Sequence, residues 1–348
     1  MHKYDYSFLK DLNISARLIS LTNTISEINT RSVYQKERYP EVFHKLVRIS
    51  TVDSTVSSNA IEGIATDEKR IKDLFEKNEN PLNHDEKQII GYSHALKYIS
   101  EHEKELRIDE KTICFLHSMI IDNDKIGGIY KKIDNTITRF YENGEREVIF
   151  EPVGADDVKE NMRRMLMAFR EAYNDSDINN MLLLPCFIVD FLAIHPFSDG
   201  NGRLSRLLTL LILYQEGYDI GKYISYEKEI ENYKWNYYEE LRKSQIGWHE
   251  NENDYSSFII FHYQILYRCY KKISELINED DLSLSKAKRI EKTIMNSVIP
   301  ISKNEISEKL PDVSITTIEK ALSDLIKDNK IRKIGDKRNA RYIQNEVD

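Results

Sequence analysis

A short polar stretch between two long apolar segments constrains this chain more than any other feature of its sequence. Residues 178–194 are mostly apolar at helical spacing, residues 207–213 are nearly all apolar, and residues 195–206 between them are largely polar. A short polar break between two such segments predicts a tight turn that joins two buried helices. We therefore expect a mainly α-helical protein with this helix pair at its centre.

The turn holds residue types that suit a phosphate group. Gly200 and Gly202 are expected to take positive φ and to let the backbone approach a ligand closely. The second helix begins there, and the free N–H groups of its first turn favour an anion. Arg203 and Arg206 lie three residues apart in that turn, where they oppose the helix dipole unless an anion of high charge lies between them.

Two further residues of the turn add a proton acceptor and a metal ligand. His195, at the end of the incoming helix, is a candidate general base. Asp199 faces the same place and can share a divalent cation with a phosphate. The whole set predicts a nucleotide phosphate site with a proton acceptor beside it. The alternative, a capped helix–turn–helix with solvated arginines, gives no packing reason for this combination.

The stretch from His195 to Arg206 matches the Fic (Fic/DOC) signature, His-Pro-Phe-x-Asp/Glu-Gly-Asn-Gly-Arg-x-x-Arg, at every specified position. The chain thus resembles the protein adenylyltransferases of that family. The resemblance implies transfer of AMP from ATP to a Ser, Thr or Tyr hydroxyl of a target protein or of the protein itself. It implies that His195 takes the hydroxyl proton, and that Asp199 holds Mg²⁺ on the α- and β-phosphates.

The resemblance also assigns the phosphate contacts. Backbone N–H groups around Gly200 and Gly202, with the side chain of Asn201, would hold the α-phosphate. Arg203 and Arg206 would hold the β- and γ-phosphates. Catalysis would then depend mainly on positioning and on stabilisation of charge.

A second motif lies well before the turn. By themselves, Glu62 and Gly63 predict the end of a helix. Because the helix dipole disfavours a carboxylate at that end, Glu62 is expected to have a cationic partner. A solvated glutamate is the alternative. Ser58-x-x-x-Glu62-Gly63 resembles the inhibitory motif of the family, Ser/Thr-x-x-x-Glu-Gly/Asn. The resemblance implies that Glu62 pairs with Arg206 and keeps the γ-phosphate from its productive pose.

Two other segments gain a role from the resemblance. Residues 136–141 and 148–150 are β-prone and flank Asn143-Gly144, which predicts a hairpin. By itself this is a surface hairpin; in the family it is a flap that binds the target protein by strand addition. The aromatic cluster around Tyr237 and Tyr238 is by itself a core stripe. The resemblance makes both tyrosines candidates for nucleotide contact.

Helix starts can be placed from capping residues. Asn83 or Asp85 is expected to cap one helix, and Asp109 is expected to cap the helix that carries His117. A lone histidine on such a helix is interpreted as structural.

The last part of the chain has a different charge and pattern. From residue 286 to residue 348 it has 14 Lys and Arg against 10 Asp and Glu, a net charge of +4. The pattern predicts three helices followed by a hairpin over 330–343. The first helix covers 287–298, the second begins at a Ser302–Glu305 capping box, and the third runs from Ser314 to Ile326. This order resembles a winged helix. The functional interpretation is DNA contact through the Ser314 helix and four basic wing residues, Lys333, Lys337, Arg338 and Arg341. The alternative is a protein-contact or dimerisation module.

We therefore expect a mainly α fold with three parts. These are an N-terminal helical region with the inhibitory helix (1–105), a Fic catalytic core with a small hairpin flap (106–280) and a winged-helix domain (281–348). A net charge of −8 excludes a generic nucleic-acid binder. Scattered cysteines, no apolar signal-peptide core and no run of about 18 apolar residues indicate a cytoplasmic protein without a membrane span.

Several alternatives stay open. The same site could remove AMP, with Glu62 positioning a water molecule, or transfer another phosphate-containing group. The chain could also be a transcription regulator in which the Fic site is a sensor and the winged helix acts on DNA. The target, the modified residue and the oligomeric state, a homodimer included, are left open.

Overall fold

The chain divides into two compact units. The computed structural model describes residues 2–345 except 78, 122, 124, 141–144, 278–283, 298 and 336–339. The first unit comprises residues 1–26 and 49–269, and the second comprises residues 27–48 and 270–348. The first unit thus contains most of the predicted N-terminal region together with most of the predicted catalytic core. The three-part division with boundaries at 105 and 280 stays a prediction.

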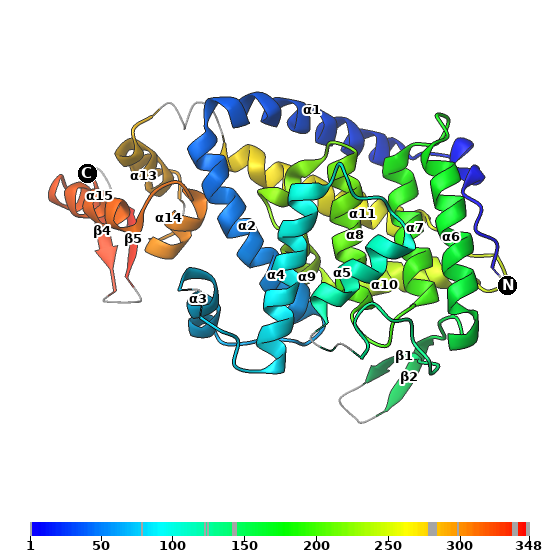
Figure 1. The fold of residues 1–348 in the computed structure, drawn as a ribbon. Helices are drawn as coiled ribbons and strands as arrows, with labels where there is room; N and C mark the ends of the chain where they lie inside the picture. The colour runs from blue at the N-terminus through cyan, green and yellow to red at the C-terminus, as the bar shows by residue number, and fades with distance from the viewer. Residues whose placement is uncertain are drawn as a thin grey trace. The chain divides into compact units, whose positions relative to one another are not determined.

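The first unit consists mainly of helices, with one small antiparallel hairpin (Figure 1). This confirms the predicted fold class. In chain order the elements are η1 (Ser7–Lys10), α1 (Ala16–Arg38), α2 (Pro40–Ile61), α3 (Glu68–Glu76), α4 (His84–His102), α5 (Glu110–Ile120), β1 (Ile137–Phe140), β2 (Arg146–Phe150), η2 (Ala155–Asp157), α6 (Val158–Tyr173), α7 (Asn180–Ile194), α8 (Asn201–Gln215), η3 (Asp219–Lys222), α9 (Tyr226–Asn232), α10 (Lys234–Gln245) and α11 (Ser256–Leu276). Helices α1, α2 and α11 also contribute residues to the second unit.

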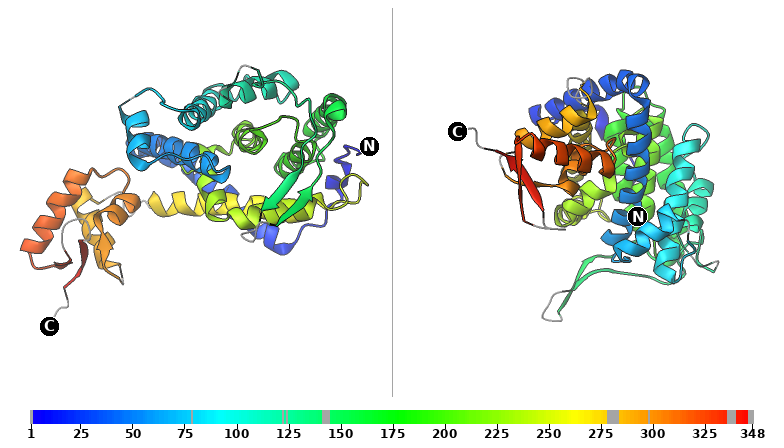
Figure 2. Two further views of the ribbon diagram at one scale, coloured as in Figure 1. Left: turned by 90° about the horizontal axis from the view of Figure 1, so that it is seen from below. Right: turned by 90° about the vertical axis from the view of Figure 1, so that its left-hand side faces the viewer.

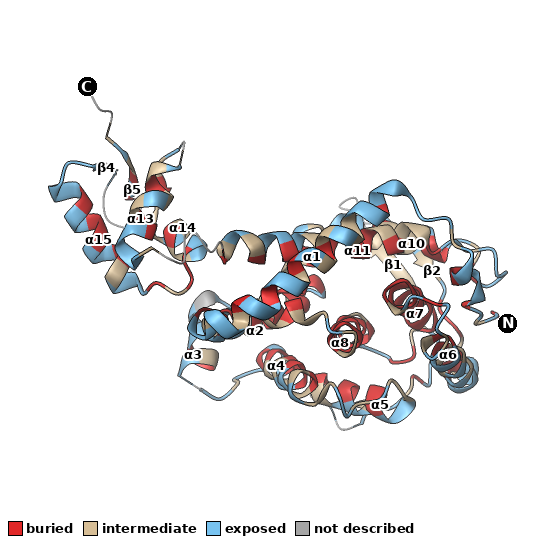
Figure 3. Ribbon diagram, turned by 90° about the horizontal axis from the view of Figure 1, so that it is seen from above, coloured by how far each residue is buried: buried red, intermediate tan, exposed pale blue. Residues whose placement is uncertain are grey.

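Helices α7 and α8 form the centre of the first unit, as predicted. Every residue of α7 from Met181 to Ile194 is buried, because the segment is apolar on all sides. Helix α8 packs against α4, α5 and α7, and α6 covers another side of α7. Figure 3 shows α8 end-on, coloured as buried, with α4, α5 and α7 around it. Within the described part of the chain, no helix combines the length and apolarity needed to cross a bilayer.

Side-chain caps fix where the neighbouring helices begin. Asn83, and not Asp85, caps α4, because its side chain accepts a hydrogen bond from the backbone N–H of Glu86. The side chain of Asp109 accepts from the backbone N–H of Thr112 and caps α5, as predicted. Helix α2 ends at Ile61, and Gly63 follows with φ of 80°. The end of α2 fixes the position of Glu62, and the cap at Asp109 fixes the start of the helix that carries His117.

The flap hairpin projects from the helical body in Figure 1 and in the right view of Figure 2. Strand β1 pairs antiparallel with β2, with Thr138 opposite Val148 and an irregularity after Ile137. The predicted Asn143-Gly144 turn lies outside the described residues. Arg139 of β1 donates to Glu239 of α10 at 2.7 Å, so β1 of the flap is fastened to the body by an ion pair.

The second unit has its own apolar core. Its C-terminal elements are α13 (Lys286–Met295), β3 (Ile301–Ser302), α14 (Lys303–Lys309), α15 (Ile315–Lys327), β4 (Ile331–Ile334) and β5 (Arg341–Gln344). The three strands form an antiparallel sheet in the order β3-β5-β4. Buried residues such as Ile294, Ile306 and Leu322 fill the space between helices and sheet.

The predicted helix starts of the second unit are confirmed, and one helix end is corrected. Ser302 and Glu305 form a capping box at α14, and Ser314 caps α15. Helix α13 ends at Met295 and not at residue 298. The winged-helix interpretation stays a prediction. Of the proposed wing residues, Lys337 and Arg338 lie outside the described residues.

A buried carboxylate fastens the start of the chain to α7. Asp190 is fully buried and accepts hydrogen bonds from Tyr6 Oη at 2.7 Å, Trp248 Nε1 at 2.8 Å and Tyr255 Oη at 2.8 Å. Burial raises the pKa of Asp190 above its ordinary value. Since Asp190 lies in the second-last turn of α7, this cluster supports the helix immediately before the polar turn.

We expect Asp190→Asn to destabilise the protein by about 1–3 kcal/mol, because an amide turns one N–H group toward donors that need an acceptor. Urea unfolding followed by circular dichroism measures the change. The control is Asp175→Asn, whose carboxylate is partly exposed and pairs with Lys10 at 2.7 Å. The control should unfold at nearly the same urea concentration as the wild type; equal losses in both variants would show that burial of Asp190 is not the cause.

Candidate active site

The turn after α7 contains two residues in the left-handed backbone region. His195 ends α7 with φ of 50°, and its N–H donates to the carbonyl of Phe191. Gly200 precedes α8 with φ of 80°, as predicted. The predicted positive φ of Gly202 is wrong, because Gly202 lies inside the first turn of α8. A histidine in this region is uncommon, so the turn holds the catalytic candidate in a constrained conformation.

Gly202 is required for a different reason: the side chain of Glu62 comes so close to it that a Cβ atom would not fit. A Cβ atom at this position would lie 3.0 Å from the Cδ atom of Glu62 and closer still to its Oε1 atom. The carboxylate of Glu62 therefore rests against the first turn of α8. The N–H groups of this turn have no intrahelical partners, and the helix dipole favours an anion there. Glu62 occupies the kind of position that a phosphate would take.

Arg206 joins this carboxylate to α2. Its Nη2 atom donates to Glu62 Oε1 and to the carbonyl oxygen of Ser58, and its Nε atom donates to Ser58 Oγ, each at 2.8 Å. The predicted contact between Glu62 and Arg206 is present. The Arg206 side chain is 2% exposed and that of Glu62 is 29% exposed. Within the described residues, Arg206 Nη1 is buried without a hydrogen-bond partner.

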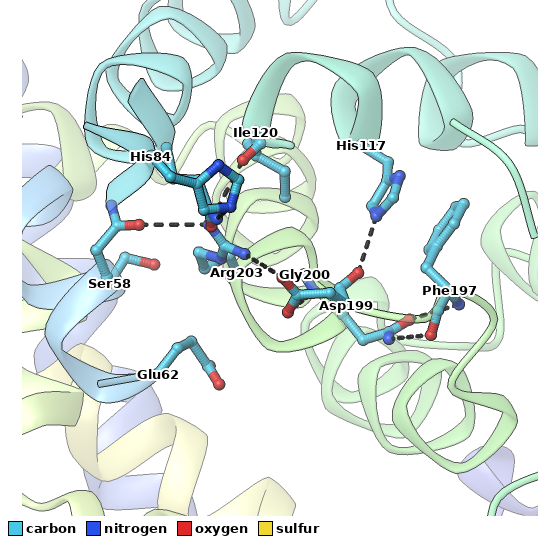
Figure 4. Close-up of polar contacts among 12 residues, drawn as sticks. Ser58, Glu62, His84, His117, Ile120, Phe197, Asp199, Gly200 and Arg203 are labelled. Carbon is cyan, nitrogen blue, oxygen red and sulfur yellow. Dashed lines mark hydrogen bonds and ion pairs between the residues drawn. The ribbon is translucent and has the colours of Figure 1, made fainter. Parts of the chain in front are cut away.

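Arg203 does not face this carboxylate. It is fully buried, and its Nη1 atom donates to Gln88 Oε1 and, at 3.4 Å, to the carbonyl of Ile120. Its Nη2 atom lies 3.3 Å from Asp199 Oδ2 (Figure 4). Burial lowers the pKa of Arg203. The expectation that both arginines face one anion is therefore not met in this structure; Arg203 ties the turn to α4 and α5.

His117 fastens the turn from another side (Figure 4). Its Nε2 atom lies 2.9 Å from the carbonyl oxygen of Asp199, and its Nδ1 atom accepts from the N–H of Gly128 at 2.8 Å. The ring stacks on Phe197 with 3.7 Å between ring centroids. Burial lowers the pKa of His117 to about 4, so the ring is neutral at pH 7. The structural interpretation of His117 agrees with these contacts.

Asn201 holds the turn from inside. Its Oδ1 atom accepts from the N–H of Phe197 at 3.0 Å, and its Nδ2 atom donates to the carbonyl of Phe197 at 2.8 Å. The Nδ2 atom also lies 3.2 Å from His195 Nδ1. The side chain is thus engaged within the turn, and its contact with an α-phosphate stays a prediction.

His195 has one partner that sequence reasoning missed, Asn135, and this partner is in turn held by Lys131. The side chain of Asn135 donates from Nδ2 to His195 Nδ1 at 2.9 Å, and Lys131 Nζ donates to Asn135 Oδ1 at 2.7 Å. Lys131 is buried, and its backbone N–H donates to the carbonyl of Pro196. Burial, followed by the charge of Lys131, lowers the pKa of His195 to about 4. No local pattern could show these contacts, because they join segments 60 residues apart.

A cavity of about 690 Å³ brings part of the predicted set together. Six predicted residues line it, namely Glu62, His195, Gly202, Arg206, Tyr237 and Tyr238. Ser58 holds Arg206 from behind, whereas Asp199, Gly200, Asn201 and Arg203 are not among the lining residues. The flap and α10 supply further lining residues that carried no recognisable sequence signal, among them Arg139, Lys234, Trp235 and Arg242. A volume of this size accommodates a nucleotide-sized ligand.

Asp199 is the predicted metal ligand. Its side chain is 59% exposed, and Oδ1 accepts from the N–H of Gly200 at 2.6 Å. Among the described residues, no group of three or more His, Cys, Asp or Glu side chains could hold a metal ion by itself. A single accessible carboxylate fits Mg²⁺ that arrives with phosphate oxygens, because Mg²⁺ is commonly bound by one or two carboxylates plus substrate phosphates.

Comparison with known proteins agrees with this architecture. Residues 107–213 match the model of the Fic/DOC family. A Fic family protein from Desulfovibrio desulfuricans G20 is similar at 18% identity and a TM-score of 0.58, over 97% of this chain and 98% of that one. A Fic domain containing signaling protein from Bacteroides thetaiotaomicron VPI-5482 is similar at 20% identity and a TM-score of 0.60, over 72% and 94%. Fic-1 from C. elegans is similar at 18% identity and a TM-score of 0.51, over 74% of each chain. The TM-scores show that these proteins share the fold of this chain.

We expect His117→Ala to destabilise the protein by about 2–4 kcal/mol at pH 7, because it removes a stacked ring and leaves Gly128 N–H and the Asp199 carbonyl without partners. The wild type should lose stability as the pH falls from 6.5 to about 4, where the unfolded histidine binds a proton and the folded one does not. Urea unfolding over this pH range should show a shallower slope for His117→Ala. His94→Ala, an exposed histidine of α4, is the control and should keep the wild-type slope.

Proposed function

We propose, from the Fic/DOC family domain that this chain carries, that the protein is an adenylyltransferase held inactive by Glu62. Members of this family commonly transfer AMP or other nucleotide groups to proteins. In our proposal AMP moves from ATP to a Ser, Thr or Tyr hydroxyl of a target protein or of the protein itself. The observation that carries the proposal is the Glu62–Arg206 ion pair against the first turn of α8, in a cavity that also contains His195.

The phosphates would bind at the start of α8. The N–H groups of its first turn favour anions, and the buried Arg206 has one unpartnered N–H₂ group among the described residues. A buried guanidinium without full hydrogen bonding is costly, which a phosphate oxygen would relieve. Tyr237 and Tyr238 line the same cavity and are our candidates for the adenine contact. Arg203 would support the site by holding the turn.

The chemical step is an in-line displacement at the α-phosphorus. The target hydroxyl oxygen forms a bond to the α-phosphorus, the bond from that phosphorus to the oxygen bridging to the β-phosphate breaks, and pyrophosphate leaves. His195 lines the cavity and takes the proton of the hydroxyl. Asp199 would hold Mg²⁺, which neutralises phosphate charge when it is bound.

Glu62 would inhibit the reaction by competition for one place. Its carboxylate lies against Gly202 and bonds Arg206, so a phosphate and Glu62 cannot both use these groups. The negative charge of Glu62 would also repel a phosphate bound beside it. Withdrawal of the end of α2 would free Arg206 for the γ-phosphate.

The flap supports a protein target. Strands β1 and β2 form a two-stranded sheet with an open edge, and an open edge can pair with an extended segment of another chain. Ile137, Thr138 and Ile149 of the flap line the cavity, so a segment added to the flap would lie beside His195. We also propose DNA contact through the second unit, a homodimer and a cytoplasmic location.

Removal of AMP is the second candidate function. The observation that favours it is the presence of Glu62 in the cavity with His195, since a carboxylate there can accept a proton from an attacking water molecule. Glu62 would then be catalytic for removal and inhibitory for transfer.

We expect Glu62→Gly to increase incorporation of labelled AMP from [α-³²P]ATP into the protein or into lysate proteins. The variant frees Arg206 for the γ-phosphate. Arg206→Ala should not be activated, because it removes the anchor of the inhibitor and the phosphate contact together. The double variant should behave like Arg206→Ala alone, as expected for residues in contact.

One further variant and two possible results for Glu62→Gly decide the proposal. Adding His195→Ala to Glu62→Gly should reduce incorporation by about 10²–10⁴-fold, the usual effect of losing a general base. If Glu62→Gly is no more active than the wild type at matched Mg²⁺ and ATP, inhibition by Glu62 is wrong. If it loses an AMP-removing activity instead, removal becomes the leading function.

We expect Asp199→Asn to weaken binding of Mg²⁺–ATP by about tenfold or more, because loss of even an outer-shell partner of a metal costs 10- to 100-fold. The amide keeps an acceptor for the Gly200 N–H but loses the ion pair with Arg203, so circular dichroism of the variant checks that the fold is kept. Calorimetry in the Glu62→Gly background, with and without Mg²⁺, measures both affinities. Equal weakening of metal-free ATP would show that Asp199 serves only the turn.

A further inference from the structure

Among the residues that the structure describes, the hydrogen bonds to the His195 ring all reach one edge, at Nδ1. Asn135 Nδ2 lies 2.9 Å from His195 Nδ1, and Asn201 Nδ2 lies 3.2 Å from the same atom. Amide nitrogens only donate, so Nδ1 is the acceptor in both contacts. Within the described residues, Nε2 has no hydrogen-bond partner, and it is the ring nitrogen left for the cavity.

The orientation of both amides is fixed by their other partners. Asn201 cannot be turned over, because its Oδ1 accepts from Phe197 N–H at 3.0 Å and its Nδ2 donates to the Phe197 carbonyl at 2.8 Å. Asn135 cannot be turned over while Lys131 is charged, because Lys131 Nζ donates to Asn135 Oδ1 at 2.7 Å. Burial lowers the pKa of Lys131 to about 8, so Lys131 is mostly protonated at pH 7.

We propose that Asn135, held by Lys131, is a positioning residue that keeps the proton of neutral His195 on Nε2. A neutral imidazole carries one proton, and a proton on Nδ1 would face two amide donors. His195 therefore presents a donor to the cavity in this conformation, in which Glu62 is also bound to Arg206. The structure thus combines a proton donor and a carboxylate acceptor, the pair that removal of AMP needs.

The removal step balances with these two groups. A water oxygen forms a bond to the α-phosphorus of the AMP-modified side chain, and the bond from phosphorus to the side-chain oxygen breaks. Glu62 accepts one proton of the water, and the departing side-chain oxygen takes the proton from His195 Nε2. This leaves His195 as an imidazolate, whose Nδ1 accepts hydrogen bonds from Asn135 and Asn201. The products are AMP and the free hydroxyl, and transfer of the proton from Glu62 through solvent restores His195.

Transfer of AMP needs the opposite tautomer, with Nε2 unprotonated. That tautomer becomes favourable when Asn135 presents its Oδ1 atom to His195 Nδ1, which requires loss of the contact with Lys131. The Lys131–Asn135 pair would thus bias the direction of the reaction. This inference rests on the proposed function for its reaction, but the tautomer itself can be measured without any activity.

The first test is the ¹⁵N NMR spectrum of the full-length protein labelled at histidine, at pH 7. The His195 signals are assigned by their loss in His195→Asn, and the two ring nitrogens differ strongly in chemical shift when only one is protonated. We expect a protonated Nε2 and an unprotonated Nδ1 in the wild type. Asn135→Asp offers a carboxylate to Nδ1 and should place a proton there. Lys131→Met, which leaves the Asn135 amide free to turn, should shift the balance the same way.

The matched controls are Lys132→Met, an exposed neighbour of Lys131, and Asn174→Asp, an exposed asparagine at the end of α6. Neither should change the His195 signals. A wild-type ring with its proton on Nδ1, or a tautomer unchanged by both Asn135→Asp and Lys131→Met, would overturn the inference. Having two variants keeps the test decisive if one of them does not fold.

The second test compares the two reaction directions. Glu62→Gly protein labelled with [α-³²P]ATP serves as the substrate for removal by unlabelled enzyme, and label uptake in the Glu62→Gly background measures transfer. Asn135→Asp should lower the ratio of removal to transfer by about tenfold or more, since a proton donor typically contributes 10²–10⁴-fold. A merely structural role would lower both rates together, and that result would overturn the inference. If Glu62→Gly takes up no label, the proposed function fails, and the spectra alone decide the tautomer.

Discussion

The buried guanidinium of Arg206 is the group on which the site depends. A charge that is 2% exposed must be compensated by the protein, and Ser58 and Glu62 of the α2 end supply the acceptors. The same contacts fix where α2 ends relative to the first turn of α8. Because Gly202 has no Cβ atom, the carboxylate can come up to that turn. The anion site at the start of α8 is therefore built with an internal anion in it.

The parts of this arrangement that follow from local chemistry could be predicted from the sequence. Neighbouring residues set the apolar segments, the caps at Asn83 and Asp109, and the end of α2 just before Gly63. The pairing of Glu62 with Arg206 could be predicted only from a motif, because 144 residues separate them. Local reasoning failed for Gly202, which serves contact with Glu62 and not a positive φ.

Arg203 and Asn135 show why the rest could not be predicted. Spacing places Arg203 and Arg206 close together on α8, but Gln88 and the Ile120 carbonyl, from α4 and the end of α5, take the first of them into the core. Asn135 stands in an irregular segment before β1, where nothing in the sequence distinguishes it. Its contact with His195 exists because Lys131 holds both the amide and the backbone of Pro196. Such contacts are decided by tertiary packing alone.

Under the proposed function, one carboxylate and one tautomer would give the site two states of opposite chemistry. With Glu62 on Arg206 and the proton on His195 Nε2, the cavity has an acceptor for water and a donor for the leaving oxygen. With Glu62 withdrawn and Nε2 unprotonated, it would have a phosphate-binding arginine and a base for a hydroxyl. Transfer would then be limited by the fraction of molecules in the second state. A change of about 1.4 kcal/mol in the free-energy difference between the two states alters their population ratio about tenfold, so a contact that moves the end of α2 would change the rate of transfer relative to that of removal.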